Sequence, residues 1–390
     1  MKVFLVLIII AIIWLLTDYI LSFFNNNKPT KNNKKNKFAI LIPARDESKV
    51  IEELLNSIIN QTRKIHTNDV YIIVEDKNDP TVQIVKNKNM NIIYRKDLTK
   101  KRKGYALDDA IKEIINSKKH YDAYFIFDAD NVLDKNYFKN MEKVYNNGYD
   151  IGIGYRNTKN GNDSVIAAAS SLTFSMINTL GNSHKSKHNN TLTISGTGFY
   201  IKGDIIEELK GYPFNSLTED YELTLYTTLH DLTTYYEKKA IFYDEQPTKY
   251  KVTINQRTRW IKGFFESRKK YIPLLLKKKI NKNFSSTFHQ IMGVNPYILL
   301  ICGLLGIILI NIKNIFIILL FVYILLVLIT LIMVLKEKNS LNINKKMKLK
   351  VILYNPIFLF TYIICLFKAI LNKDVKWVKI DHNKNLDTSI

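Results

Sequence analysis

Three short motifs whose residue types could perform group-transfer chemistry stand in a fixed order along this chain. Asp128-Ala129-Asp130 follows an apolar run, and its two carboxylates could hold a divalent cation beside a diphosphate. Thr218-Glu219-Asp220 could supply a general base, and Gln256-Arg257-Thr258-Arg259-Trp260 could bind a pyrophosphate and an acceptor. Each motif also has an ordinary structural explanation: a solvated turn, a capped helix start and an amphipathic surface helix, respectively.

The elements that must position these motifs alternate between short apolar runs and helical stretches. We predict strands over residues 38–42, 70–74, 91–94 and 124–127, and helices over residues 47–60 and 106–115. This alternation indicates an α/β fold, a mostly parallel sheet with right-handed crossover helices. Ligands of such sheets bind beyond the carboxyl ends of the strands, where acidic pairs stand at Asp46-Glu47, Glu75-Asp76 and Asp128-Ala129-Asp130. One site could therefore collect all three pairs.

Four apolar runs are long enough to cross a membrane. Residues 3–24 form the first, and residues 294–310, 315–335 and 351–371 form three more. The alternative for the first is a cleaved signal peptide, but the run is long for one and Asn25-Asn26-Asn27 offers no small-residue cleavage site. We predict a transmembrane helix at 1–24, a basic linker at 25–37, a catalytic domain at 38–255, an amphipathic interfacial helix at 256–282, a membrane region of two or three spans at 294–371 and a tail at 372–390.

The net charge of +22 is concentrated beside the apolar runs. Basic clusters lie within residues 28–37, 268–282 and 336–350. Lys and Arg next to spans are the positive-inside signature and favour anionic lipid, so this distribution argues against nucleic acid as a partner. Because both flanks of the middle domain are basic, we place that domain in the cytoplasm, on a multi-pass protein of the cell membrane. Cys302 and Cys365 lie inside apolar runs and are predicted to be small core residues rather than a disulfide or metal pair.

Further residues could contact a nucleotide, a phosphate or an acceptor. Glu75 or Asp76 could accept the N–H of a uracil or contact a ribose, or the pair could form a turn with Asn78-Asp79-Pro80. Lys103 could contact a phosphate or belong to a solvated basic loop. The small-residue loop Ser195-Gly196-Thr197-Gly198-Phe199 precedes a predicted strand at Tyr200-Ile201 and could line the acceptor path or be an ordinary turn.

Gln256, Arg259 and Trp260 share one helical face at the spacing i, i+3 and i+4. Arg suits bidentate phosphate binding, and Trp offers a flat face for a sugar ring. The alternative is a helix on the bilayer surface, with Trp260, Phe264 and Phe265 dipping in. Both hold if the helix lies on the membrane and its first turn reaches the site. The histidines show no metal-ligand spacing, and the sequence contains neither a G-x-S-x-G elbow nor a Walker A motif.

Together these motifs resemble the family 2 glycosyltransferases with a GT-A fold, in particular the membrane-embedded processive branch of cellulose, hyaluronan and poly-N-acetylglucosamine synthases. The resemblance covers roughly residues 38–271 and the flanking spans. Pro43-Ala44-Arg45-Asp46-Glu47 looks like the family's opening motif. Glu75-Asp76 stands where the family has a uridine-binding acidic pair, although Lys77-Asn78 replaces the usual Gly-Ser. Lys103-Gly104 looks like the Gly-Lys element with its order altered.

The resemblance assigns a role to each motif. It implies that Asp128 contacts the nucleotide and the metal, Asp130 binds the metal, and Asp220 is the general base, with Glu219 beside it as a substrate contact. Gln256, Arg259 and Trp260 match the family's Gln-x-x-Arg-Trp element, which binds the pyrophosphate and the acceptor end. The implied reaction is inverting transfer of a hexosyl unit from a UDP-sugar, with Mg²⁺ or Mn²⁺, to a growing polysaccharide or a glycolipid acceptor.

The chain departs from secreting synthases in having fewer predicted spans. A transferase that adds one sugar to a lipid carrier, and a non-catalytic membrane scaffold, therefore stay as alternatives. Three full C-terminal spans would put the tail outside, yet residues 373–385 are basic. One explanation is that residues 351–371, which contain Pro356, form a re-entrant segment. A partner subunit or a second copy of the chain is left open.

Overall fold

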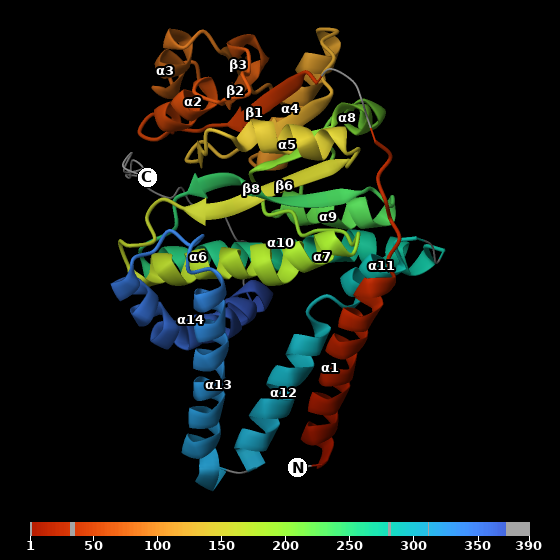
Figure 1. Ribbon diagram of the computed structural model, residues 1–390, viewed down its shortest axis with the longest axis vertical. Helices are drawn as coiled ribbons and strands as arrows, with labels where there is room; N and C mark the ends of the chain where they lie inside the picture. The colour runs from red at the N-terminus through yellow and green to blue at the C-terminus, as the bar shows by residue number, and fades with distance from the viewer. Residues whose placement is uncertain (1, 32–35, 280–281, 311, 372–390) are drawn as a thin grey trace.

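The structure, a computed structural model, describes residues 2–31, 36–279, 282–310 and 312–371. An α/β domain lies at one end, a layer of helices lies beneath it, and three long helices project away from that layer (Figure 1). The functional site lies between the α/β domain and the helical layer, so both parts are described before it.

One eight-stranded sheet runs through the α/β domain in the order β3-β2-β1-β4-β7-β6-β8-β5. The first four strands are parallel and hold the predicted apolar runs: β3 (Asn91–Tyr94), β2 (Val70–Val74), β1 (Phe38–Pro43) and β4 (Ala123–Ile126). Of the other four strands, β7 (Phe199–Lys202) contains the strand predicted at Tyr200-Ile201. The sequence analysis did not predict β6 (Ile151–Thr158), β8 (Thr234–Asp244) or β5 (Val132–Leu133). Because β7 runs antiparallel to both neighbours and β5 to β8, the sheet is mixed but mostly parallel, as expected.

Helices cover both faces of this sheet. Alternate side chains of a strand point to opposite faces, so Ile40 and Ile42 of β1 join one core and Ala39 and Leu41 join the other. The first core is closed by α2 (Ile51–Ile59), α3 (Thr81–Asn87) and α5 (Tyr137–Asn146). The second is closed by α4 (Lys103–Asn116), α8 (Gly203–Leu209) and α9 (Glu219–Leu229). Fully buried parallel strands explain why these runs are apolar throughout.

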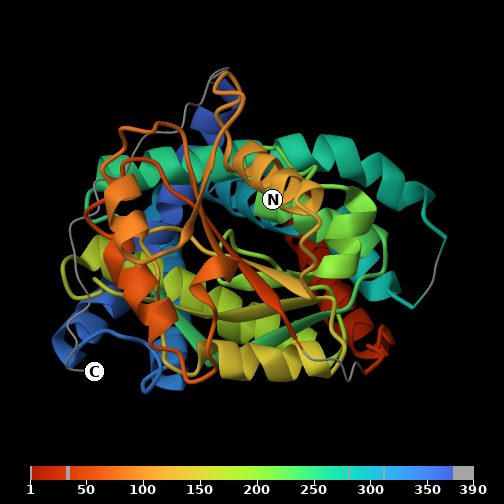
Figure 2. The same cartoon turned by 90° about the horizontal axis from the view of Figure 1, so that it is seen from above.

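The helical layer holds α6 (Val165–Met176), the π-helical turn η3 (Ile177–Asn182), α7 (Ser183–Lys187), α10 (Tyr250–Lys277) and α11 (Phe284–Met292). From above, α10 runs along one side of the domain (Figure 2). It starts at Tyr250, six residues before the predicted amphipathic helix. Trp260 packs edge-on against Phe174 of α6, with ring centroids 5.9 Å apart, and Phe264 stacks on Tyr221 of α9 at 4.8 Å. Both rings therefore contact protein, whereas Phe265, the third residue expected at the bilayer surface, is exposed.

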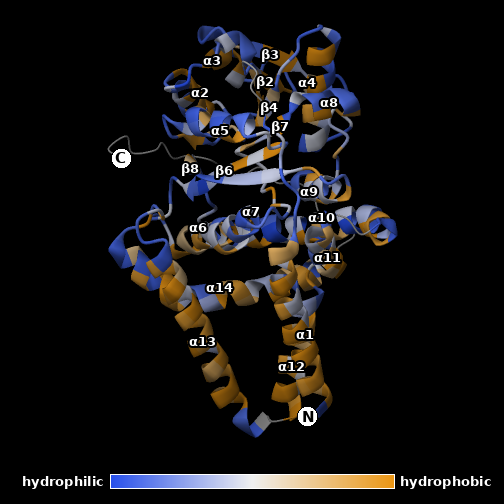
Figure 3. Cartoon of the chain, turned by 45° about the vertical axis from the view of Figure 1, so that its right-hand side comes forward, coloured by the Kyte–Doolittle hydropathy of each residue, from blue (hydrophilic) through white to orange (hydrophobic). Residues whose placement is uncertain are grey.

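The three projecting helices are α1 (Lys2–Leu21), α12 (Asn295–Ile310) and α13 (Ile315–Lys336), and most of their residues are hydrophobic (Figure 3). Each is part of a helical segment long and apolar enough to cross a membrane, as predicted. Two glycines of α12 let α1 approach closely: a Cβ atom added to Gly303 would lie 2.6 Å from Ile8 Cγ1, and one added to Gly306 would meet Phe4. Of the two cysteines, Cys365 is buried as predicted, whereas Cys302 is exposed on α12.

The fourth apolar helix, α14 (Lys345–Leu371), takes a different course. It also has the length and composition of a span, but it runs crosswise to α13, directly beneath the helical layer (Figures 1 and 3). It packs against α10, α13 and α6. Its polar Asn355 donates to Thr330 Oγ1 of α13 at 3.1 Å, which satisfies an amide on an apolar helix. The helix is thus continuous over its described length and crosses α13 at an angle. The predicted tail lies outside the described residues.

Candidate active site

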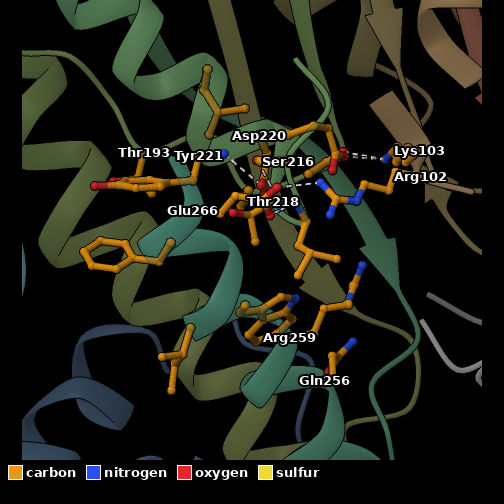
Figure 4. A pocket seen from close by; sticks show the side chains of 18 of the residues that line it. Arg102, Lys103, Thr193, Ser216, Thr218, Asp220, Tyr221, Gln256, Arg259 and Glu266 are labelled. Atoms are coloured by element: carbon orange, nitrogen blue, oxygen red, sulfur yellow. Dashed lines mark hydrogen bonds and ion pairs between the residues drawn. The ribbon is translucent and has the colours of Figure 1, made fainter. Parts of the chain in front are cut away.

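Residues of all three motifs line a single cleft of about 1780 Å³ between the sheet and the helical layer. The carboxyl ends of β1, β2 and β4 form its upper wall, and α9 and α10 form its floor. In Figure 4, Lys103 and Asp220 lie in the upper part of the view, while Gln256 and Arg259 lie below them on α10. The cleft thus collects groups separated by more than a hundred residues, as expected for strand ends in an open parallel sheet.

Asp128 and Asp130 lie in the turn that follows β4. Asp128 Oδ1 accepts a hydrogen bond from Lys103 Nζ at 2.5 Å. Asp130 is 9% exposed, and its carboxylate accepts from the backbone N–H of Glu245 at 3.1 Å and from Asn131 Nδ2 at 3.2 Å. The Asp130 carboxylate is thus held by two protein donors, while the Asp128 side chain, 40% exposed and bonded to Lys103, faces the cleft.

Lys103, at the start of α4, connects the first two motifs. Its ammonium donates to Asp128 and, at 2.7 Å, to the backbone carbonyl of Gly196, and it lies 3.9 Å from Glu219 Oε1. Burial acts to lower the pKa of Lys103, but the carboxylates of Asp128 and Glu219 outweigh it, and the net pKa is raised. A fixed positive charge therefore lies at the centre of the cleft. The alternative of a solvated loop does not describe Lys103, although it fits the exposed Lys101 beside it.

Glu219 and Asp220 form the first turn of α9, as predicted. Thr218 occupies the N-cap position, yet its hydroxyl makes no capping bond within the described structure; it packs against α10, where a Cβ atom on Gly263 would lie 2.5 Å from Thr218 Oγ1. Burial raises the pKa of Glu219 to about 7, with Lys103 opposing the rise and Asp220 adding to it. Burial likewise raises the pKa of Asp220, against the lowering effect of its hydrogen bond from Tyr221 N–H. Asp220 is thus a stronger proton acceptor than an exposed aspartate.

The loop Ser195–Gly198 lies against Asp220, which favours the functional alternative for this segment. Gly196 has φ +80°, and a Cβ atom there would lie 3.4 Å from Asp220 Oδ2. Thr197 Oγ1 accepts from the backbone N–H of Asp128 at 2.9 Å and also bonds to Asn131 Oδ1. The loop therefore holds the turn after β4 and, through a glycine that tolerates a left-handed conformation, leaves room beside Asp220.

The third motif presents the predicted face. Gln256, Arg259 and Trp260 all line the cleft. Arg257, between them, points the other way: its side chain is 2% exposed, and its guanidinium lies 3.6 Å from the ring centroid of Phe358 and 4.4 Å from that of Tyr362 on α14. It also donates to Thr361 Oγ1 at 2.9 Å. One turn of α10 thus presents Gln256, Arg259 and Trp260 to the cleft, while Arg257 on its opposite side binds α14.

The two residues of the acidic pair Glu75-Asp76 lie in different surroundings. Glu75 lines the cleft and lies 3.3 Å from Arg45 Nε and 3.7 Å from Arg95 Nη1. Asp76 is exposed, is absent from the lining among the described residues, and accepts from the backbone N–H of Asn78 at 2.8 Å. The turn alternative therefore describes Asp76, and only Glu75 stays a candidate for nucleotide contact.

Sequence reasoning missed Arg156 on β6. Its guanidinium lines the cleft, forms a 2.5 Å ion pair with Asp244 on β8, donates to the carbonyl of Ser195 at 2.8 Å and lies 3.7 Å from the ring centroid of Phe174. Neither strand was predicted, and the one signal that could have found Arg156 is its place directly after the apolar residues 151–155.

The donor set fits a divalent cation that also binds phosphate. Within the described residues no group of three or more His, Cys, Asp or Glu side chains could enclose a metal by itself. Asp128 and Asp130 supply two carboxylates at the cleft wall, and Mg²⁺ is commonly bound through one or two carboxylates together with phosphate oxygens of a substrate. These residues therefore suit a metal that arrives with a diphosphate, rather than a metal held by protein alone.

Comparison with known proteins shows what this chain is similar to. YdaM of Bacillus subtilis (strain 168), described as a probable glycosyltransferase, is 27% identical over 245 residues, which make up 58% of this chain and 55% of YdaM. The chain thus matches about half the length of that curated relative. The mannosyltransferase PcManGT of Pyrobaculum calidifontis, solved with GDP-Man and Mn²⁺, has the same fold, with a TM-score of 0.58, 14% identity, and coverage of 94% of this chain and 100% of that one.

A weaker similarity links the chain to TarS of S. aureus in complex with UDP-GlcNAc, at a TM-score of 0.45 and 14% identity over 66% of this chain and 71% of that one. Residues 35–263, more than half of the chain, match the family described as glycosyltransferase like family 2. The protein therefore belongs to glycosyltransferase family 2, with a GT-A fold.

Proposed function

We propose that this protein transfers a hexosyl unit, with inversion at C1, from a UDP-sugar to a hydroxyl group of an acceptor at a membrane surface. The observation that carries the proposal is the meeting of Asp128, Lys103 and Asp220 in one cleft, with Lys103 bonded to Asp128 and to the Gly196 carbonyl beside Asp220. Anionic and cationic groups are thereby placed on either side of the position that a diphosphate would occupy.

The residues divide the work as follows. Asp220 accepts the proton of the attacking hydroxyl, the hydroxyl oxygen forms a bond to C1 of the sugar, and the bond from C1 to the diphosphate oxygen breaks. Lys103 and Arg259 bind the departing diphosphate, and Trp260 offers its face to the sugar ring. A Mg²⁺ or Mn²⁺ ion held by Asp128 and Asp130 would neutralise the charge that develops on the leaving diphosphate. Glu219 contacts the substrate beside the base.

A GDP-sugar is the alternative to a UDP-sugar as the donor. Glu75, held by Arg45 and Arg95, would contact the uridine. PcManGT is described in complex with GDP-Man, which makes a GDP-sugar the second donor class to test.

The test uses the full-length protein in nanodiscs with Mg²⁺ or Mn²⁺. UDP-glucose, UDP-N-acetylglucosamine, UDP-galactose, UDP-glucuronate and GDP-mannose are screened for release of the nucleoside diphosphate. Asp220→Asn is the test variant, and Asp204→Asn, an exposed aspartate in the first turn of α8, is the matched control. We expect release from one donor that is lost in Asp220→Asn only. Release from no donor, together with no nucleotide binding, would favour a non-catalytic scaffold. The length of the product separates a processive synthase from a single-sugar transferase.

We further propose that α1, α12 and α13 cross the cell membrane and that the catalytic domain is cytoplasmic. The ends of these helices next to the domain carry the basic clusters, and α14 lies along that surface (Figure 3). In a background without native cysteines, an impermeant maleimide should label Lys313→Cys on intact cells. It should label Asn339→Cys only after permeabilisation, and the reverse pattern would refute this orientation.

A further inference from the structure

The catalytic cleft does not end at the α/β domain. The same cavity continues past Trp260 between the membrane helices, where side chains of α12, α13 and α14 line it. We call this part the membrane arm. Its lining includes residues of α12 up to Leu304, Val322 and Leu326 of α13, and Leu359 and Ile363 of α14. A ligand in the membrane arm would thus share one continuous space with Asp220.

The chemistry of the arm favours hydrocarbon. Among the described lining residues of these three helices, only Tyr297 and Tyr362 carry a polar side-chain atom; the others are Val, Leu, Ile or Phe. A glycan chain would bring many hydroxyl groups into this space without hydrogen-bond partners, at a cost of roughly 1–3 kcal/mol for each unpaired group. An acyl or prenyl chain has no such requirement and gains from leaving water.

The depth of the arm matches one leaflet. At 1.5 Å per residue, Leu304 lies about 15 Å deeper along the helix than Val294, where the lining of this segment begins. Val322 lies about 21 Å from Lys336, the end of α13 beside the domain. The described residues nearer the far ends of α12 and α13 do not line the cavity. The arm therefore stops short of a hydrocarbon core about 30 Å thick, so it suits a lipid tail better than a polymer crossing the membrane.

The head of the ligand would meet Asp220 and Glu219, which are both acidic. A phosphate nucleophile is already anionic and would need no base, whereas a neutral hydroxyl needs one, and Asp220 lies in the cleft to supply it. The geometry points to an acceptor that is a hydroxyl-bearing membrane lipid, taken from the leaflet beside the catalytic domain, with its hydrocarbon in the membrane arm. This inference rests on the proposed function and names its acceptor class. The lipid hydroxyl oxygen bonds to C1, its proton passes to Asp220, and the nucleoside diphosphate leaves.

The experiment blocks the arm without touching the catalytic groups. Leu326 and Ile363 line it, and the double variant Leu326→Trp/Ile363→Trp narrows it from two helices. Leu328→Trp/Ile364→Trp is the matched control, because Leu328 is 50% exposed and Ile364 is 46% exposed on the outer faces of the same helices. Both proteins are reconstituted in nanodiscs of phosphatidylcholine that contain a dioleoylglycerol analogue with a diazirine in its acyl chain.

We expect photolabelling of arm-lining peptides of α12 and α14 in the wild type and in the control, with a loss of at least fivefold in the arm variant. In nanodiscs of total bacterial lipid extract, sugar from the donor should enter butanol-extractable lipid, again with a loss of at least fivefold in the arm variant alone. Labelling that is equal in all three proteins, or sugar recovered in water-soluble polymer at the same rate in all three, would overturn the inference.

Failure of the inference can be distinguished from failure of the proposed function by nucleotide binding. If the arm variant binds UDP with Mn²⁺ as the wild type does but keeps full transfer, the acceptor does not use the arm and the transferase assignment stands. If photolabelling depends on the arm while no donor releases its nucleotide, the arm binds lipid and the transferase assignment fails.

Discussion

Glu219 should destabilise the protein at neutral and alkaline pH, and replacing it by Gln should remove that cost. The side chain is 8% exposed, and its pKa rises from 4.5 to about 7, because burial penalises the charged form more than Lys103 favours it. At 1.36 kcal/mol per pKa unit, this difference corresponds to about 3 kcal/mol. Where the pH is high enough to ionise Glu219, the buried charge therefore lowers the stability of the fold.

The sign of the pH effect on stability follows from the number of protons that the folded and unfolded states bind. Between pH 4.5 and pH 7 the folded protein keeps a proton on Glu219 that the unfolded chain has lost, so stability from this group falls as the pH rises through that window. Below pH 4.5 both states are protonated, and the group contributes no difference. Above pH 7 the full cost is present. Glu219→Gln cannot ionise, so it should gain most over the wild type at pH 8 and little at pH 4.5.

The assay is thermal unfolding of the ligand-free protein in detergent with EDTA, at pH 4.5 and pH 8. A gain of about 3 kcal/mol corresponds to a rise in Tm of roughly 6–12 °C at pH 8 for a domain of this size. Glu208→Gln, an exposed glutamate of α8, is the control and should leave Tm unchanged at both values. A Tm difference between Glu219→Gln and the wild type that is the same at both pH values would refute the reasoning, because packing changes do not titrate.

The remaining predictions concern the other parts of the cleft. Gly196→Ala should lower kcat at least tenfold, because it strains a residue at φ +80° and adds a methyl group 3.4 Å from Asp220 Oδ2; Gly181→Ala, in open space, should keep full activity. Asp130→Asn should abolish transfer and remove the dependence of nucleotide binding on Mn²⁺, measured by calorimetry, while insertion into the membrane is unchanged. Arg257→Lys should lower stability by about 1–3 kcal/mol in chemical unfolding, because an ammonium cannot stack on two rings and donate to α14 as the planar guanidinium does. An unchanged unfolding midpoint for Arg257→Lys would contradict the conclusion that the contacts of Arg257 with α14 stabilise the protein.

The parts of the fold that the sequence predicted are those governed by local patterns. The first four strands were predicted within a residue, because strands buried on both faces must be apolar throughout, and the acidic residues after them mark the ends at which ligands bind. The spacing of Gln256, Arg259 and Trp260 likewise determines a shared face as soon as the segment is helical. In both cases the information lies within a few residues of the feature.

The parts that escaped prediction depend on distant partners. Arg156 enters the cleft because Asp244, on a strand 88 residues away, pairs with it, and no local pattern reports that pairing. Hydropathy located the apolar residues 351–371 of α14, although the helix begins earlier, at Lys345. It carries no information about the direction of the helix, which is determined by contacts with α10 and α6. Asp76 looked equivalent to Glu75 in sequence, yet adjacent side chains at a strand end point to different sides, and only one of them faces the cleft.

Because α14 runs crosswise, it contacts both the turn of α10 that carries Arg259 and the membrane arm. Phe358 and Tyr362 hold Arg257, which fixes the turn of α10 that presents Arg259 to the cleft. On the same helix, Ile363 lines the membrane arm. A helix parallel to α13 could form a wall of the arm but could not lie beneath α10. By lying across the foot of the catalytic domain, α14 sets the position of the predicted diphosphate ligand and that of the predicted lipid tail with respect to each other.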